Sequence, residues 1–150
     1  MGHTYTNLNY HLVFSTKDRQ PLITKSTQPK LYAYIGGIIR EMKGEMLAIG
    51  GVEDHVHILC RLGTAVSLAD ALRQIKGSSS RWANEELELD GKFAWQTGYG
   101  AFSVSQSKTA SVERYISEQD DHHRKRGFKE ELLDFLQRHG VGYDERYLWD

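Results

Sequence analysis

The sequence predicts an α+β fold: a ferredoxin-like, RRM-like split βαββαβ arrangement with helices on one face of an antiparallel sheet, followed by a C-terminal tyrosine-bearing helix. Three observations predict it. Aromatic and β-branched segments alternate with segments of helical periodicity in the required order. Two strand-like segments are separated only by Glu53 and Asp54, which indicates an antiparallel hairpin. An amphipathic segment follows the last strand-like segment.

The first strand and helix lie in residues 10–42. Residues 10–16 are aromatic and β-branched, and the charged turn at 17–20 ends this strand before Pro21. Gly36 and Gly37 weaken the following helix by about 1 kcal/mol each relative to alanine, so close packing against a neighbour is expected there. Gly44 is expected to end the helix. Its core-facing stripe comprises Leu31, Ile35, Ile38, Ile39 and Met42.

The hairpin and a second long helix come next. Residues 46–52 and 55–62 are the two hairpin strands. Ser67 is a natural N-cap for the helix, and Asp70 lies near its positive end. The small polar run at 76–82 is expected to follow this helix. The buried stripe of the helix comprises Leu68, Ala71, Leu72 and Ile75.

The last elements are a strand at 101–105 and two helices. Ser107 or Thr109 is expected to cap the first helix, and Gly140 to stop the second. The sheet face opposite the first two helices needs another partner, and RNA-recognition modules of similar layout place nucleic acid there. The first of the last helices carries Val112, Tyr115, Ile116 and Gln119, and the second carries Leu132, Leu133, Phe135 and Leu136.

Length and composition narrow the class of protein. The 150 residues are expected to form one domain, 1–150, and no apolar run approaches the ~18–20 residues that cross a membrane. The single cysteine, Cys60, excludes an internal disulfide framework and fits a reducing cytoplasm. The net charge is −1, yet residues 1–82 carry ten Lys and Arg against six acidic residues, and residues 83–150 carry nine against fourteen. The basic half could present a phosphate-facing surface.

His55 and His57 are the first candidates for chemistry. Alternate side chains of a strand point to one face, so both imidazoles share a face, and Val56 and Ile58 share the other. Two imidazoles one pleat apart can hold a single divalent metal ion. Taken alone, a His-x-His pair is more often two histidines on a half-exposed strand.

Tyr115 and Gln119 form the second candidate pair. Residues four apart on a helix lie on the same face. Gln119 offers a carbonyl oxygen as a third metal ligand, and Tyr115 offers a phenol that can attack phosphorus and hold a covalent intermediate. For this pair alone, a core tyrosine and a solvated glutamine are the favoured alternative.

Four motifs carry a resemblance to a known family. They are residues 10–17 (YHLVFSTK), 50–59 (GGVEDHVHIL), 95–105 (WQTGYGAFSVS) and 115–119 (YISEQ). Together they resemble the single-tyrosine HUH transposases (His, hydrophobic, His) of the smallest insertion sequences, including the REP-associated tyrosine transposases. The resemblance covers nearly the whole chain. It departs at Asp18, where relatives often carry tyrosine, which weakens an inferred DNA contact but touches no catalytic position.

The resemblance implies a transposase that cleaves and rejoins single-stranded DNA at element ends through a 5′-phosphotyrosine intermediate. Tyr115 would be the nucleophile, and His55, His57 and Gln119 would bind Mg²⁺ or Mn²⁺. Free tyrosine has a pKa of about 10, so attack at neutral pH needs the metal or a nearby base. The released 3′-hydroxyl can attack another phosphotyrosine, so joining needs no nucleotide cofactor. The implied partners are hairpin-containing single-stranded DNA and a second copy in a homodimer, without a membrane.

Basic and aromatic residues are candidates for DNA contacts. Trp82, Trp95 and Tyr99 could stack on unpaired bases, although large aromatics are more often core. His11 is either support for the metal ligands or simple packing. The cationic run at 122–126 could meet phosphates or the acidic pair before it. The cations named as DNA contacts, each also explicable as an ordinary solvated cation, are Lys17, Arg19, Arg73, Lys76 and Arg81.

Two other functions remain open. One is a catalytically inactive or domesticated protein that binds hairpin DNA without cutting it. The presence of both His55 and His57 together with Tyr115 and Gln119 argues against it, because binding alone does not need all four. The other is a replication-initiation or conjugative nickase of the same HUH class, which would normally be larger.

Overall fold

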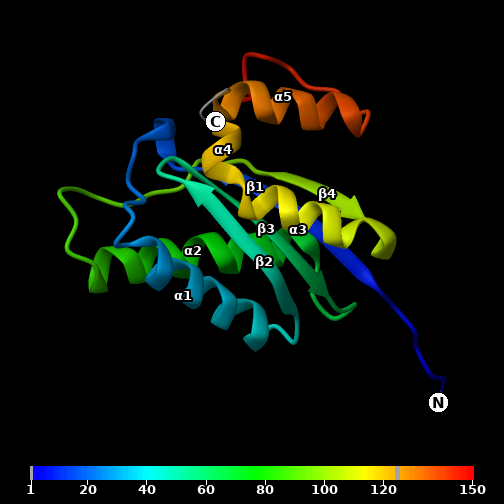
Figure 1. Ribbon diagram of the computed structural model, residues 1–150. Helices are drawn as coiled ribbons and strands as arrows, with labels where there is room; N and C mark the ends of the chain where they lie inside the picture. The colour runs from blue at the N-terminus through cyan, green and yellow to red at the C-terminus, as the bar shows by residue number, and fades with distance from the viewer. Residues whose placement is uncertain (1, 124–125) are drawn as a thin grey trace.

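The computed structural model describes residues 2–123 and 126–150. Its four strands form one antiparallel sheet in the order β2-β3-β1-β4, which confirms the predicted fold class (Figure 1). The elements in chain order are β1 (Leu8–Ser15), the 3-10 helix η1 (Lys17–Arg19), α1 (Gln28–Glu41), β2 (Glu45–Val52), β3 (His55–Leu62), α2 (Leu68–Glu86), β4 (Gly100–Val104), the 3-10 helix η2 (Gln106–Lys108), α3 (Thr109–Ser117), α4 (Gln119–His123) and α5 (Phe128–Arg138).

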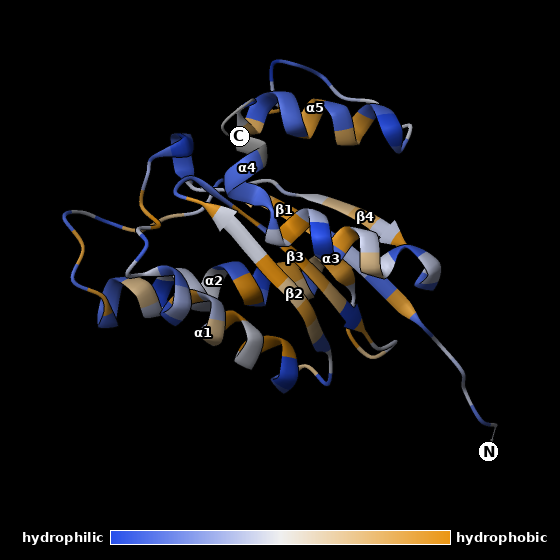
Figure 2. Ribbon diagram, viewed as in Figure 1, coloured by the Kyte–Doolittle hydropathy of each residue, from blue (hydrophilic) through white to orange (hydrophobic). Residues whose placement is uncertain are grey.

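Helices cover both faces of the sheet. Helices α1 and α2 pack on one face, and α3, α4 and α5 lie on the other (Figure 1). Figure 2 shows both hydrophobic and hydrophilic residues on α5, as expected for a helix with one side against the sheet. The face for which a nucleic-acid partner was expected is therefore covered by the chain itself. The core under α5 comprises Val13, Phe102, Phe128, Leu132 and Leu136.

Strand alternation separates the two faces as predicted. Val56 and Ile58 of β3 belong to the core beneath α1 and α2, whereas His55 and His57 point to the face under α5. In the register of β1 with β3, Val13 lies opposite His57. The hairpin of β2 and β3 turns at 53–54, as its spacing indicates.

Helix α2 is longer than expected. It continues through the polar run at 76–82 and ends at Glu86. Ser79 is fully buried and continues the apolar stripe, while the hydroxyl of Ser80 donates to the carbonyl oxygen of Gly77 at 3.2 Å. Tertiary packing therefore outweighs the low helix propensity of glycine and serine. The predicted cap at Ser67 is confirmed, since its hydroxyl accepts from the Asp70 amide at 3.1 Å.

The predicted end of α1 is wrong, whereas the predicted end of α5 is confirmed. Helix α1 ends at Glu41, and the residue with left-handed backbone is Lys43 (φ 63°), not Gly44. Gly44 is needed for space instead, because a Cβ there would lie 2.8 Å from the carbonyl oxygen of Arg61. Gly140 does end α5 with φ 65°, as predicted.

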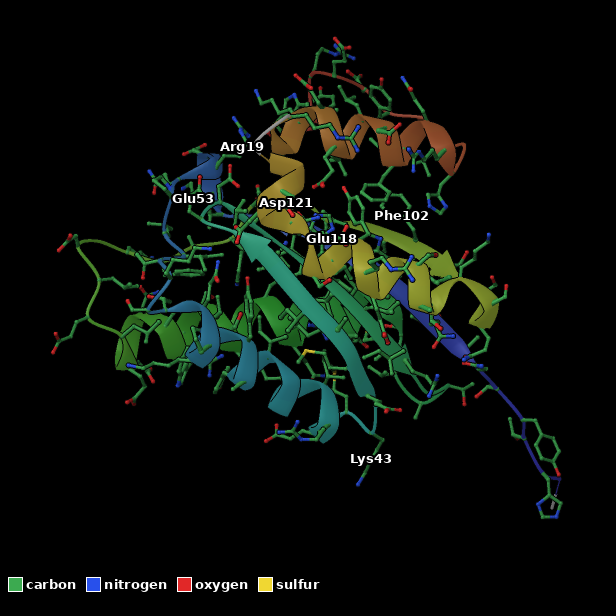
Figure 3. The ribbon with its side chains drawn as sticks, in the orientation of Figure 1. Arg19, Lys43, Glu53, Phe102, Glu118 and Asp121 are labelled. Carbon is green, nitrogen blue, oxygen red and sulfur yellow. The ribbon has the colours of Figure 1, made fainter. Side chains whose placement is uncertain are left out.

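The tyrosine-bearing segment is broken where one helix was expected. Helix α3 ends at Ser117, and α4 begins at Gln119 after the non-helical Glu118 (Figure 3). Neither Ser107 nor Thr109 caps α3; its N-cap position is Lys108, without a side-chain cap. Tyr115 and Gln119 thus lie on consecutive helices.

Candidate functional site

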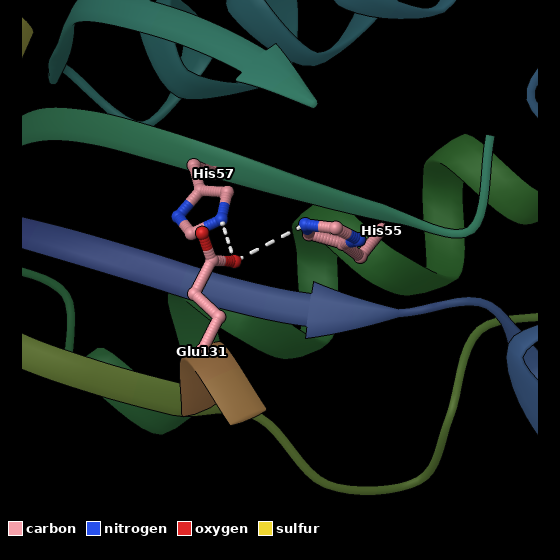
Figure 4. Close-up of side chains that lie close together, drawn as sticks. All are labelled: His55, His57 and Glu131. Carbon is pink, nitrogen blue, oxygen red and sulfur yellow. Dashed lines mark hydrogen bonds and ion pairs between the residues drawn. The ribbon is translucent and has the colours of Figure 1, made fainter. Parts of the chain in front are cut away.

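Four side chains with metal-binding chemistry meet on the sheet face beneath α5. We call His55, His57, Gln119 and Glu131 the ligand cluster. His57 Nε2 lies 2.7 Å from Glu131 Oε1, and His55 Nε2 lies 3.3 Å from the same oxygen (Figure 4). Gln119 Oε1 lies 3.3 Å from His55 Nε2. The structure brings the three ligands expected from the sequence together and adds a carboxylate.

The ligand cluster has a donor set that suits a divalent cation. One ligand atom each from His55, His57 and Glu131 lie within 4.8 Å of one another. All four side chains are buried, with at most 1% of their surface exposed. The two oxygen donors suit Mg²⁺ or Mn²⁺, and the imidazoles suit a transition metal. The residues present therefore fit the ion that the sequence predicted.

Tyr115 lies at the edge of the ligand cluster. Its phenol donates a short hydrogen bond to Glu131 Oε2. Its ring centroid is 5.7 Å from that of His57 and 5.5 Å from that of Phe135, which meets it edge-on. One chain thus supplies both the histidine pair and the tyrosine.

The environment of Tyr115 disfavours its ionised form. Burial and the neighbouring Glu131 carboxylate raise the pKa of the phenol well above its ordinary value, although Arg126 and Gln119 oppose the shift. The phenol is therefore protonated at neutral pH in this arrangement. Its use as a nucleophile requires a proton acceptor or a cation.

His55 is held in its charged form. Burial alone would lower its pKa, but the Asp54 and Glu131 carboxylates outweigh burial and raise the pKa to about 9. Asp54 Oδ1 lies 2.7 Å from His55 Nδ1, so this carboxylate also orients the ring. Such a carboxylate behind a histidine is the usual support for a metal ligand.

His11 supports His57. Its Nε2 lies 2.8 Å from His57 Nδ1, on the side of that ring away from Glu131. Burial and the neighbouring His57 lower the pKa of His11 to about 3, so His11 is neutral. Of the two roles weighed from the sequence, the contact favours support over packing alone.

Glu131 is the functional candidate that the sequence analysis missed. It is fully buried on α5 and contacts His55, His57 and Tyr115. Its one local signal is its position, three residues after Phe128 and four before Phe135, on the apolar side of an amphipathic helix. A carboxylate there is informative because acidic residues are rarely buried without a partner.

The residues proposed for DNA contacts fall into two groups. Arg73, Lys76 and Arg81 line one cavity beside α2, whereas Lys17 and Arg19 lie on η1. Of the aromatic candidates, Trp95 is buried, Trp82 stacks on Tyr34 with centroids 4.7 Å apart, and Tyr99 is 42% exposed. Residues 124–125 of the cationic run lie outside the described residues.

The sequence matches a known family over most of its length. The family model described as "Transposase IS200 like" matches residues 4–119. The ISDra2 transposase TnpA of Deinococcus radiodurans is 26% identical over 125 residues, covering 80% of this chain and 89% of that protein. The transposase for insertion sequence element IS200 of Salmonella typhimurium is 27% identical over 128 residues, covering 79% and 81%.

Solved structures share the fold. A candidate transposase from Deinococcus radiodurans R1 superposes with a TM-score of 0.61 at 26% identity, covering 79% of this chain and 96% of that one. A REP-associated tyrosine transposase bound to a REP hairpin superposes with a TM-score of 0.60 at 15% identity, covering 82% and 73%. Within residues 2–123 and 126–150, no helix combines the length and apolarity that crossing a membrane requires.

Proposed function

Because the chain belongs to the IS200-like transposase family, we propose that it cleaves and rejoins single-stranded DNA through a 5′-phosphotyrosine at Tyr115, assisted by Mg²⁺ or Mn²⁺. The observation that carries this proposal is the meeting of the Tyr115 phenol with the ligand cluster. Residues from β3, α3, α4 and α5 contribute to it. A core tyrosine and a solvated glutamine would not need to converge on two buried histidines.

The ligand cluster would hold the ion through His55, His57, Gln119 and Glu131. A divalent ion held there would supply Lewis-acid polarisation of a phosphoryl oxygen and would stabilise the charge that develops in phosphoryl transfer. Asp54 and His11 fix the two imidazoles from behind, through contacts of 2.7 and 2.8 Å. The protein's own contribution is thus a set of ligands oriented before DNA arrives.

Glu131 also has a role toward Tyr115, as a proton acceptor. Its carboxylate already accepts the hydrogen bond of the phenol, so it is placed to take the proton that Tyr115 must lose on attacking phosphorus. Because the ligand cluster is buried, a phosphodiester reaches it only after α5 moves away from the sheet. We expect single-stranded DNA binding to favour that displacement.

A covalent-adduct assay tests the proposal. Labelled single strands from the DNA flanking the gene are incubated with the protein and Mg²⁺ or Mn²⁺, then run on a denaturing gel. We expect a metal-dependent protein–DNA band that EDTA abolishes. Absence of an adduct with either metal, with a shifted band on a native gel, would contradict strand transfer.

That contradicting result would favour the second candidate, a hairpin-binding protein that does not cut. The relative bound to a REP hairpin makes hairpin DNA a reasonable ligand to test. We also propose a homodimer, as the family resemblance implies. Since one chain supplies both Tyr115 and the histidine pair, each copy would carry its own site, and light scattering of the full chain tests the dimer.

Metal binding should depend on pH through His55. In the metal-free protein the pKa of His55 is about 9, and a metal ligand must be neutral, so the ion displaces a proton. Below pH 9 the affinity for Mn²⁺ should therefore fall by about tenfold per pH unit, and above it the affinity should level off. Isothermal titration calorimetry in two buffers of different ionisation enthalpy measures both the affinity and the proton released.

Two variants that replace aspartate with asparagine test this dependence. Asp54→Asn removes a carboxylate that raises the His55 pKa, so the pH at which the Mn²⁺ affinity levels off should be lower. Asp90→Asn, at an exposed position after α2, should leave the profile unchanged. Equal profiles for the two variants would contradict the role given to Asp54.

A further inference from the structure

A basic cavity lies beside α2, on the side of the sheet that α1 and α2 cover. It has a volume of about 560 Å³ and lies between α2 and the segment 92–99. We propose that it binds one unpaired nucleotide of a DNA strand, with the base in the cavity and the adjoining phosphates at its rim. This inference rests on the proposed function, because it assumes single-stranded DNA as the substrate. We call this cavity the nucleotide pocket.

Side-chain hydrogen bonds hold the walls of the nucleotide pocket in place. Lys76 Nζ donates to the carbonyl oxygens of Thr97 and Gly98 at 3.0 and 2.7 Å. The Trp95 indole donates to the Ser79 hydroxyl at 2.9 Å. Further along α2, the Asn84 amide group bonds both the N–H and the C=O of Phe93, at 2.7 and 2.9 Å. These bonds therefore preform the pocket along about two turns of α2, from Lys76 to Asn84.

The charges around the nucleotide pocket favour an anion. Four cations line it, and no carboxylate of the described residues does: the cations are Arg73, Lys76, Arg81 and Lys92. Arg81 and Lys92 are exposed and make no ion pair with any residue in the described ranges, so they remain available for phosphates. Burial lowers the pKa of Lys76 to about 8, which a bound anion would reverse.

The shape and lining of the nucleotide pocket suit a planar base. Its volume lies within the usual range for small-ligand pockets, roughly 300–1,000 Å³. Tyr99 is 42% exposed and offers an aromatic face, with Lys76 Nζ 5.8 Å from its ring centroid. Bases stack on exposed aromatics whatever their identity, while phosphates pair with nearby cations. An acidic peptide would satisfy the cations but would leave Tyr99 without a planar partner.

The nucleotide pocket lies across the sheet from the ligand cluster. Helix α2 packs on the face opposite α3 and α5 (Figure 1). A nucleotide held there is not the one that Tyr115 attacks. The pocket should therefore govern how tightly a strand binds, and it should leave the chemistry at Tyr115 unchanged once the strand is saturating.

The test measures binding of a labelled oligothymidylate of about twelve nucleotides to the full chain in EDTA, by fluorescence anisotropy. Arg81→Glu with Lys92→Glu should weaken binding at least tenfold, and should reduce the dependence of log affinity on log salt by about 1.4. Lys30→Glu with Arg40→Glu reverses two exposed charges on α1 and should weaken binding less than threefold. An equal loss of DNA affinity in the two double variants would contradict the proposed pocket, because it would show that only the net charge of the protein matters.

The base is tested separately from the phosphates. Tyr99→Ala should weaken binding about fivefold or more, and Tyr99→Phe should restore it. A strand with abasic sites should bind the unmodified protein more weakly, but should show no further loss with Tyr99→Ala. If the abasic strand binds as tightly as the intact one, or polyglutamate competes as well as DNA, the proposal is overturned. If no covalent adduct forms but the variants still differ in DNA binding as expected, the proposed strand transfer is wrong and the nucleotide pocket is supported.

Discussion

Tyr115→Phe should abolish the covalent DNA adduct while leaving DNA binding within twofold of the unmodified protein. Phenylalanine keeps the aromatic contacts with His57 and Phe135, at 5.7 and 5.5 Å between ring centroids, but removes the only atom that could form the phosphotyrosine bond. Removing a nucleophile outright costs several orders of magnitude in rate, so we expect a loss of at least about 10⁴-fold. Single-turnover cleavage on a denaturing gel measures it.

The same variant should fold. Glu131 loses the phenol as a hydrogen-bond donor but keeps His57 at 2.7 Å and Gln119 Nε2 at 3.4 Å, so we expect a change of about 1 kcal/mol in the free energy of unfolding. Tyr34→Phe is the matched control, because that ring stacks on Trp82 on the other side of the sheet. An adduct that survives in Tyr115→Phe would mean that another residue attacks the DNA.

The parts of the fold that sequence predicted well depend on local patterns. The two-residue turn at 53–54 and the alternation of His55 with Val56 fix β3 and its two faces without reference to distant residues. The errors arise where distant packing outweighs local preference. The run after Ile75 stays helical because Ser79 is buried against the core, and α3 breaks at Glu118 although its sequence suits one continuous helix.

The candidate site was predictable in part for the same reason. His55 and His57 share a face through strand alternation alone, and Tyr115 with Gln119 matched a family motif. Neither strand alternation nor a family motif indicates Glu131. The match to the family model ends at residue 119, and the position of α5 depends on a core that includes residues of β1 and β4. Phe102 of β4 lies in that core beneath α5 (Figure 3), and no local pattern links it to a glutamate 29 residues later.

Gly50→Ala should reduce strand cleavage by about 100-fold, by displacing Tyr115. Gly50 lies on β2 opposite His57, and α3 crosses directly over it. A Cβ at this position would lie 2.5 Å from the carbonyl oxygen of Ile116 and 3.0 Å from its Cγ2. A backbone carbonyl cannot rotate away as a side-chain end can, so α3 must shift, and Tyr115 shifts with its neighbour Ile116. A displacement of about 1 Å at a catalytic group costs on the order of 10²-fold in rate.

The same substitution should lower the free energy of unfolding by about 1–3 kcal/mol through overpacking, which chemical denaturation measures. Mn²⁺ binding should change less than cleavage, because His55 and His57 lie on β3 and not on the displaced helix. Gly37→Ala is the control: a Cβ there meets only the end of the Arg40 side chain at 3.8 Å, so alanine should stabilise α1 by about 0.5–1 kcal/mol and leave cleavage unchanged. Wild-type cleavage by Gly50→Ala would show that the position of Tyr115 does not depend on the close approach of α3 to β2. The nucleophile would then have to be positioned from α5, through the hydrogen bond between its phenol and Glu131.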